Sequence, residues 1–212
     1  MNRIYLLTAM LCLSMFFSCT EVERDNCYDE KSINYKKCFS DVPSSSNSSC
    51  DISGYKTVQI GNQFWMAENL NCYVEGSVCY DNSPANCRKY GRLYDWEAAN
   101  IVCPKGWHLP SYDEWQELVD FAGGHDIAGK YLKTSVWGGD DRHGFSALPG
   151  GYGYSDGSFS NVGDIGGWWS VCNGMCTASF AYDLDMYQSN AIVIYWTPSN
   201  KSAFLYVRCV QD

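Results

Sequence analysis

Cysteines are the residues of this 212-residue chain with the clearest chemistry, and the sequence contains 12 of them. Cys12 lies inside an apolar N-terminal segment, and Cys19 lies just after that segment. The other ten cysteines are an even number. In an oxidising compartment an even number of cysteines predicts disulfides, up to five here. The histidines, His108, His125 and His143, are far apart, and no pair has zinc-site spacing with cysteine. A transition-metal site is therefore not indicated.

Aromatic side chains give the main indication of ligand binding. The chain has eight Trp and 16 Tyr, and sugars present apolar C–H faces that stack on rings beside carboxylates and amides. In the second half of the chain these aromatics alternate with Gly, Ser, Asn and Asp, on segments with too many glycines for continuous core strands. Loops on a rigid scaffold commonly carry function. The residues that we expect to bind a ligand are Trp137, Asp140, Asp141, Tyr152, Tyr154, Phe159, Trp168 and Trp169.

A role in the core is the alternative for these aromatics. A fold with little regular structure needs large side chains to fill its interior. The tryptophans that we expect to be structural are Trp65, Trp96, Trp107 and Trp115. Trp168 and Trp169 are adjacent, and adjacent residues of a strand point to opposite faces. One of the two should therefore face the core and the other the loops.

Acidic residues in the glycine-rich loops raise the question of calcium. Oxygen ligands on such turns suit this ion, and the loop acids are Asp140, Asp141, Asp156 and Asp164. A solvated acidic loop fits the sequence better. We therefore expect no cofactor, with calcium on these loops as the weaker alternative. No Ser/His/Asp arrangement, phosphate loop or carboxylate pair can be assigned, so we expect no enzyme.

The N-terminus is typical of a bacterial export signal. Arg3 is its sole side-chain cation, and the apolar run over residues 4–17 is too short to span a bilayer. The run ends at Ser18 and Cys19, and a small residue before cysteine is typical of a lipoprotein processing site. Cys19 would then be diacylated and become the first mature residue. Two phenylalanines before Ser18 are unusual at such a site, so cleavage by an ordinary signal peptidase is the alternative.

The chain is acidic once the signal is removed. Without residues 1–18 it carries 14 Lys and Arg against 24 Asp and Glu, a net charge of −10. Nucleic acid is then an unsuitable partner, because phosphate backbones require clustered cations. Residues 19–53 are polar, with seven serines among residues 40–53, and cannot bury enough surface to offset the entropy of ordering them. We expect this segment to be a tether and residues 54–212 to form one domain.

Hairpin and helix signals locate the first elements of that domain. Residues 55–60 alternate apolar and polar side chains, Gly61 and Asn62 provide a two-residue turn, and residues 63–68 return as the second strand. A first helix is predicted at about residues 95–102, with Asp95 as its cap. In a second helix Ser111 and Glu114 make a capping box.

The rest of the domain follows from the same patterns. Apolar residues recur at helical spacing from Trp115 to Ala122, and a Gly-Gly pair ends this second helix. Short strands are predicted at residues 167–171, 179–185, 191–195 and 203–210. The expected architecture is therefore α+β, with two short helices flanking twisted antiparallel strands and long loops.

Several long motifs resemble a known family. They are Y-K-T-V-Q-I-G-N-Q-F-W-M-A-E-N-L-N at 55–71, S-V-C-Y-D-N-S-P-A-N-C at 77–87, Y-G-R-L-Y-D-W-E-A-A-N-I-V-C-P-K-G-W-H-L-P-S-Y-D-E-W at 90–115, G-F-S-A-L-P-G-G-Y at 144–152, G-G-W-W-S at 166–170 and Y-V-R-C-V-Q-D at 206–212. By these motifs the chain resembles the Fibrobacter succinogenes major paralogous domain family. Members of that family are similar to the C-type lectin and formylglycine-generating-enzyme folds. The resemblance implies a lectin-like fold and a cell-envelope address.

The resemblance also implies particular disulfides. A bridge from Cys103, just after the first helix, to Cys209 on the last strand matches the lectin-like pattern and closes a loop of about 100 residues. A local bridge between Cys79 and Cys87 matches the family pattern. The expected pairs are Cys79–Cys87, Cys103–Cys209 and Cys172–Cys176, while Cys27–Cys38 and Cys50–Cys72 are guesses among the remaining cysteines.

Cys172 and Cys176 carry an enzymatic alternative. Formylglycine-generating enzymes use two cysteines late in a similar fold to bind copper and to oxidise a substrate cysteine with oxygen. Here the spacing is one residue shorter, and residues 177–182 replace the Arg-rich stretch of those enzymes. A disulfide that closes a loop through Gly174 is therefore preferred to a Cu(I) site. The Glu-Pro-Asn or Gln-Pro-Asp and Trp-Asn-Asp triplets of calcium-dependent lectins are absent.

These observations favour a non-enzymatic lipoprotein of the bacterial cell envelope. We expect it to be anchored by lipid at the outer membrane or cell surface, with no other contact to the membrane. Its ligand would be extracellular polysaccharide or another envelope component. The alternatives are a copper-dependent oxidase and a purely structural envelope protein.

Overall fold

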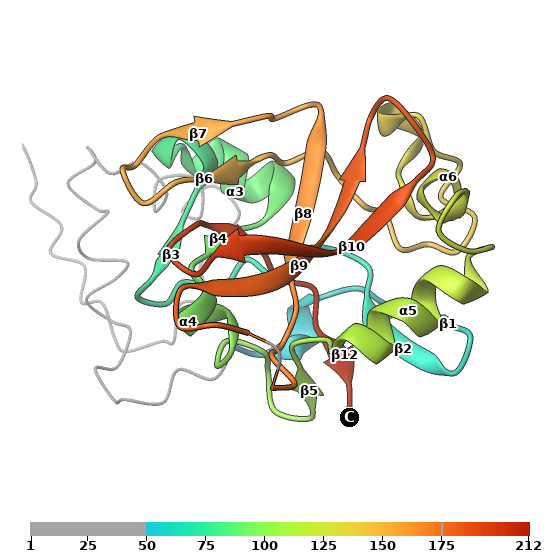
Figure 1. Ribbon diagram of the computed structural model, residues 1–212, viewed down its shortest axis with the longest axis horizontal. Coiled ribbons are helices and arrows are strands. Elements are labelled where there is room, and N and C mark those ends of the chain that lie inside the picture. The colour runs from blue at the N-terminus through green and yellow to red at the C-terminus, as the bar shows by residue number, and fades with distance from the viewer. Residues whose placement is uncertain (1–49, 175) are drawn as a thin grey trace, which may run out of the picture. The chain divides into compact units, whose positions relative to one another are not determined.

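A computed structural model describes residues 50–174 and 176–212. In this part the chain is an α+β domain with few helices and mainly antiparallel strands, which agrees with the predicted class (Figure 1). The α-helices are α3 (Pro84–Tyr90), α4 (Trp96–Ala99), α5 (Tyr112–Phe121) and α6 (Ala128–Leu132). The 3₁₀ helices are η1 (Ile52–Gly54), η2 (Tyr80–Asn82) and η3 (Ser135–Trp137). None of the helices in these residues has the length and hydrophobicity to cross a bilayer.

The larger sheet has six strands in the order β10-β9-β8-β11-β4-β3. They are β3 (Ser77–Val78), β4 (Leu93–Tyr94), β8 (Ile165–Trp169), β9 (Phe180–Tyr187), β10 (Val193–Asn200) and β11 (Leu205–Tyr206). Neighbours are antiparallel, except that β8 and β11 are parallel. β10 is an edge strand, which accommodates Pro198 because proline has no N–H for a further partner. β9 is paired along both edges and is therefore a rigid support for side chains.

The second sheet joins the two ends of the domain. β1 (Thr57–Ile60) and β2 (Gln63–Met66) form the predicted hairpin, with Gly61 at φ 62° in its turn. β12 (Val210–Gln211) pairs with β2 and with β5 (Trp107–His108). The single strand predicted at residues 203–210 is therefore wrong, because β11 belongs to the larger sheet and β12 to this one. A small third sheet pairs β6 (Tyr152–Gly153) with β7 (Phe159–Ser160).

Both predicted helices are confirmed. In α5 the side chain of Ser111 accepts from the Glu114 amide, while Glu114 accepts from the Ser111 amide, as in a capping box. α4 is shorter than predicted and is capped by Asp95, which accepts from the amide of Ala98. α3 and α6 are not in the prediction, because they are too short to show an apolar period. α6 also contains Gly129, where a Cβ would lie 2.6 Å from the carbonyl oxygen of Ala191.

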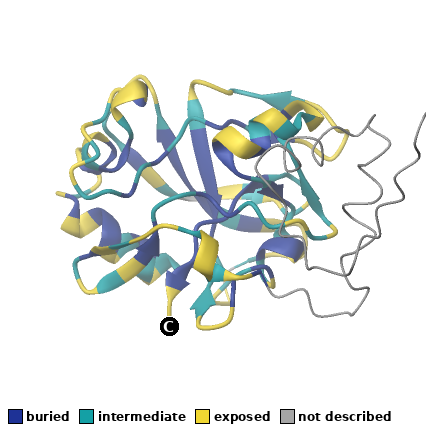
Figure 2. Ribbon diagram, turned by 180° about the vertical axis from the view of Figure 1, so that it is seen from behind, coloured by how far each residue is buried: buried dark blue, intermediate teal, exposed yellow. Residues whose placement is uncertain are grey.

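The core consists of two clusters of buried side chains. One contains Trp65 and Trp115, whose ring centroids are 4.7 Å apart, together with Trp168. The other contains Trp169, and Trp96 and Trp107 pack against it. All four tryptophans that were expected to be structural thus contribute to the interior. Figure 2 shows buried residues concentrated on the central strands and exposed residues on helix surfaces and loops.

A buried polar network connects four of the sequence motifs. The guanidinium of Arg208 donates to Asn69 Oδ1 through Nε at 3.1 Å and Nη2 at 2.7 Å. Its Nη1 donates to the carbonyl oxygens of Met66, at 3.2 Å, and Phe145. Trp168 Nε1 donates to the same Asn69 oxygen at 2.8 Å. Burial lowers the pKa of Arg208 to about 9, so the side chain remains charged at neutral pH.

The described part of the chain, residues 50–174 and 176–212, contains four disulfides. Their Cα–Cα distances are between 5.0 and 5.9 Å, within the usual range. They are Cys50–Cys72, Cys79–Cys87, Cys103–Cys209 and Cys172–Cys176. The last three are the expected pairs, and the first is one of the two guesses. Cys19, Cys27 and Cys38 lie outside the described residues.

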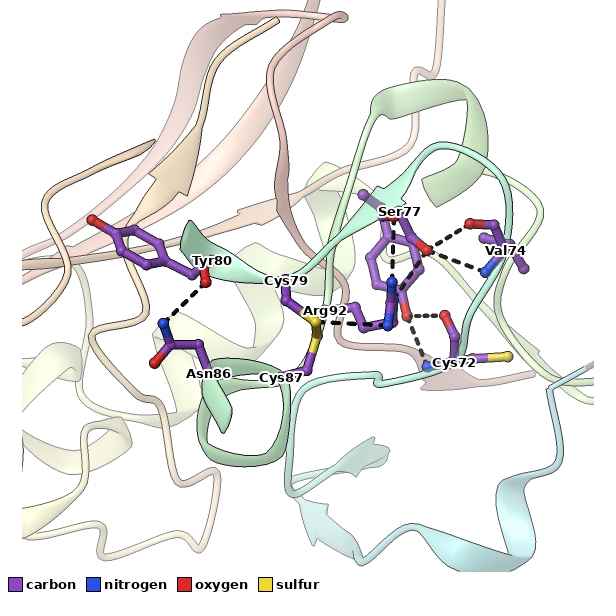
Figure 3. The surroundings of a disulfide bond; sticks show 9 residues. Cys72, Val74, Ser77, Cys79, Tyr80, Asn86, Cys87 and Arg92 are labelled. Carbon is purple, nitrogen blue, oxygen red and sulfur yellow. Dashed lines mark hydrogen bonds between the residues drawn. A yellow bond between two sulfur atoms is a disulfide. The ribbon is translucent and has the colours of Figure 1, made fainter. Parts of the chain in front are cut away.

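The short bridge Cys79–Cys87 joins η2 and α3 to the larger sheet (Figure 3). Arg92 lies against this bridge, with Nη1 3.7 Å from Cys79 Sγ. Its Nε donates to the hydroxyl of Ser77 at 3.1 Å. The disulfide and Arg92 together hold α3 and the residues that follow it beside β3.

Candidate functional site

The structure buries three of the aromatic residues that the sequence assigned to ligand binding. Trp137, Trp168 and Trp169 are each no more than 1% exposed. Lys133 lies over the ring of Trp137, 5.2 Å from its centroid, and its ammonium donates to two carbonyl oxygens of the β9–β10 turn. Phe159 packs against Tyr80 with a centroid distance of 5.2 Å. The expectation that these rings form an exposed face is therefore wrong.

Trp168 and Trp169 show why the expectation of an exposed aromatic face was wrong. Their side chains do point to opposite faces of β8, because one belongs to each core cluster. Trp168 Nε1 donates to Asn69, and Trp169 Nε1 donates to the carbonyl of Tyr94 at 2.7 Å. β8 lies in the middle of the larger sheet, and both faces are covered there. The alternation rule gave the correct faces, but the assumption that one face was open was wrong.

The loop acids are used in local turns. Asp141, at φ 47°, accepts from the amide and hydroxyl of Ser146, each at 2.7 Å. Asp140 accepts from Arg142 at 3.2 and 3.3 Å. Asp156 accepts from the amide and hydroxyl of Ser158. Over residues 50–174 and 176–212, no group of three or more His, Cys, Asp or Glu side chains is arranged to hold a metal ion.

Two of the predicted residues, Tyr152 and Tyr154, remain accessible, and we call them the tyrosine pair. Tyr154 is 44% exposed, and Tyr152 is partly buried. The rings meet edge to face with centroids 5.3 Å apart. Tyr154 donates its hydroxyl to that of Tyr152 at 3.2 Å, and Asn161 Nδ2 donates to Tyr152 at 2.8 Å. The hydrogen bond from Tyr154, together with burial, raises the pKa of Tyr152 to about 12.

A surface depression of about 390 Å³ begins at the residue after Tyr154. Its lining residues are Asp95, Glu97, Ser155, Lys201, Ser202 and Phe204. Phe204 bridges to Gly153, so the depression and the tyrosine pair share the same backbone support. Lys201 lies 4.0 Å from the ring centroid of Trp96. The site thus combines aromatic rings with carboxylates, hydroxyls and one ammonium group. Its residues come from α4 and its cap, from β6 and the loop after it, and from the segment between β10 and β11 (Figure 1).

Two buried carboxylates, which we call the acid pair, lie close to the tyrosine pair. Asp183 and Asp185 are 3% and 9% exposed, and alternate residues of β9 share one face. Burial and the charge of Asp185 raise the pKa of Asp183 well above its usual value. Burial raises the pKa of Asp185 to about 6, and its charge contributes to the raised pKa of Tyr152 and of Tyr187.

Sequence reasoning did not find the acid pair. The signal was the alternation D-L-D-M-Y over residues 183–187, in a segment predicted to be a strand. Alternating acids on a strand normally indicate a solvent face. Leu184 and Met186 do face one core cluster, but the opposite face is also covered here.

Two larger grooves lie elsewhere. One, of about 480 Å³, follows the outer side of α5 and has mainly polar and acidic residues around Phe121. The other, of about 400 Å³, lies beside α3 and includes Arg88 and Lys89. None of these three hollows is lined by an aromatic residue that the sequence assigned to binding. The depression nevertheless begins next to one of them in the chain, because Ser155 follows Tyr154, and it is therefore the better candidate although it is smaller.

Comparison with known families identifies the domain. The model of the Fibrobacter succinogenes major domain matches residues 58–211, which is most of the chain. The chain belongs to this family. The predicted resemblance is thus confirmed, and the Fibrobacter succinogenes major domain contains both the tyrosine pair and the acid pair. No curated protein and no solved structure gives a significant match.

Proposed function

We propose that this protein is a non-enzymatic binding module of the bacterial cell envelope that recognises polysaccharide through the tyrosine pair and the adjacent depression. The domain would have a C-type lectin-like fold on a lipid-anchored tether. The observation that carries the proposal is the accessible ring of Tyr154, which contacts Tyr152 and directly precedes Ser155 of the depression in the chain.

The geometry suits a sugar. A pyranose ring can stack its C–H face on Tyr154, while its hydroxyls reach the polar groups of the depression. Glu97 and Lys201 supply an acceptor and a donor there. The edge-to-face contact and the hydrogen bond between the tyrosines restrict the rings before a ligand arrives, which reduces the entropy lost on binding.

The cysteines support binding rather than the copper-oxidase alternative. Cys172 and Cys176 form a disulfide with a Cα–Cα distance of 5.5 Å. A Cu(I) site requires two reduced thiolates, which this bond removes. Stoichiometric copper binding that disappears in a Cys172→Ser, Cys176→Ser double variant would reverse this preference.

Glycan binding is tested by screening the mature protein against insoluble plant polysaccharides and soluble glycans. We expect retention on at least one of them. Tyr154→Ala should weaken binding about fivefold, because one exposed stacking ring contributes on the order of 1 kcal/mol. Tyr152→Phe keeps the ring but removes the shared hydroxyl, and it should weaken binding less.

Tyr73 provides a matched control. It is 61% exposed and does not line the depression, and the guanidinium of Arg92 lies 5.0 Å from the centroid of its ring. Tyr73→Ala should bind as the parent does. If it loses as much affinity as Tyr154→Ala, or if the parent binds no glycan, the proposal is wrong.

The envelope address has a separate test. Lipid on Cys19 would anchor the protein, since acyl chains add membrane affinity in proportion to their buried length. Intact mass of the membrane-extracted protein should show acyl chains on Cys19. An unmodified mature N-terminus downstream of that residue would refute the anchor without bearing on glycan binding.

A further inference from the structure

The acid pair lacks the partners that buried carboxylates normally have. Ser199 Oγ donates to Asp183 Oδ2 at 2.8 Å, and the hydroxyl of Tyr187 donates to Asp185 Oδ2 at 3.3 Å. Neither carboxylate takes part in any salt bridge among the described residues. Two negative charges in a dry environment are unstable unless something compensates them.

Two buried oxygen atoms at the acid pair have no partner at normal hydrogen-bonding geometry. They are Asp183 Oδ1 and Thr197 Oγ1. Thr197 is the residue opposite Asp183 on β10, and its hydroxyl lies near enough to both carboxylates to lower their pKa values, against the larger effect of burial. Unsatisfied buried atoms of this kind are rare and require an explanation.

A glycine lets one carboxylate of the acid pair approach the neighbouring strand closely. Gly167 is the residue opposite Asp185 on β8, and a Cβ at this position would lie 2.8 Å from Asp185 Oδ1. Any side chain here would press on the carboxylate. The Asp185 carboxylate therefore lies directly against the backbone of β8.

We propose that Asp183, Asp185 and Thr197 bind a calcium ion. Two carboxylates balance the charge of one divalent cation, whereas a single shared proton would leave one negative charge in the interior. The donor set is entirely oxygen, which hard cations such as Ca²⁺ prefer and transition metals do not. Calcium also tolerates irregular geometry and completes its six to eight ligands with carbonyl oxygens or water.

This inference is independent of the proposed function, because it concerns the cation alone. It also differs in place from calcium on the glycine-rich loops, since Asp140, Asp141 and Asp156 are used in their own turns.

The test uses the full mature protein, stripped of metal with EDTA and titrated with Ca²⁺ in the absence of glycan. Calorimetry at pH 7.5 should show one Ca²⁺ per chain, and Ca²⁺ should raise the thermal midpoint. Mg²⁺ should bind more weakly, because it demands regular octahedral geometry.

Conservative variants locate the site. Asp183→Asn and Asp185→Asn keep the shape but remove one charge each, and each should weaken Ca²⁺ binding at least tenfold. Asp156→Asn, an exposed loop acid, is the matched control and should bind as the parent does. If the Asn variants do not fold, Thr197→Val keeps both charges and the side-chain volume, and it should still weaken binding.

Three outcomes would overturn the proposal. The first is a parent protein that binds no Ca²⁺ at pH 7.5 and is instead stabilised by acid, which would show that the acid pair holds protons. The second is loss of binding in Asp156→Asn. The third is unchanged binding in a folded Asp183→Asn or Thr197→Val variant.

Discussion

Replacing Arg208 with lysine should be among the most destabilising conservative changes in this domain. The guanidinium is fully buried and makes hydrogen bonds to Asn69 Oδ1 and to two main-chain carbonyls, of Met66 and Phe145. A lysine ammonium is a point charge on a flexible stem and cannot reproduce this fork. At least one carbonyl would then lose its donor inside the core.

The magnitude follows from those bonds. A hydrogen bond to a charged group contributes about 1.5–3 kcal/mol, and a buried polar group left unpaired costs about 1–3 kcal/mol. Losing two of the bonds should therefore lower the free energy of unfolding by roughly 3 kcal/mol or more. Small domains are stable by only about 5–15 kcal/mol in total, so the change should be plain in any equilibrium measurement.

Urea unfolding followed by tryptophan fluorescence, with disulfides intact, measures the loss. The dependence of unfolding free energy on urea should keep its slope, since the surface exposed is the same. Arg142→Lys is the control, because this exposed arginine pairs with Asp140 at 3.3 Å and exposed pairs contribute below about 1 kcal/mol. An Arg208→Lys variant within 1 kcal/mol of the parent, at unchanged slope, would refute the argument.

Two further predictions concern the disulfides and pH. Replacing Cys103 and Cys209 together with serine should cost about 4–5 kcal/mol in the chain-entropy model, against about 2 kcal/mol for Cys172 and Cys176, because the closed loops differ greatly in length; equal losses in urea unfolding would contradict this. Burial opposes charge on His108, but its hydrogen bonds to Asp212 and Glu114, both 2.7 Å, outweigh burial and raise its pKa. Its contribution to stability should be complete below pH 6.5 and decline as pH rises through the folded-state pKa, and a thermal midpoint in His108→Gln with the same pH slope as the parent would contradict this.

Short-range sequence patterns correctly predicted the elements that depend only on neighbouring residues. The hairpin required only alternation and a Gly-Asn turn, and α5 required only a capping box, helical spacing and terminal glycines. α6 was missed because its decisive feature, Gly129 against the carbonyl of Ala191, is a contact between residues far apart in sequence. The break between β11 and β12 was missed for a similar reason. The segment between them carries Arg208 and Cys209, whose partners are distant.

The candidate site was predicted only in part. Of the aromatics named for binding, Tyr154 is 44% exposed, and Tyr152 is partly buried because it also packs against a core cluster. Trp137, Trp168 and Trp169 were predicted incorrectly, since composition alone cannot show whether a glycine-rich segment lies over the core or away from it. In this domain the glycines instead admit close neighbours: a Cβ on Gly166 would lie 3.0 Å from the ring of Trp137.

The same limit explains the acid pair. Alternation along a strand determines which residues share a face, and this holds for β8 and for β9. It does not determine whether the second face is covered, and in the larger sheet it is. Trp169 is buried on that face without an unsatisfied hydrogen-bond donor, because its indole N–H donates to a carbonyl oxygen. Covering Asp183 leaves one oxygen without a partner, so the residues that best indicate a bound cation are those that sequence patterns assign to solvent.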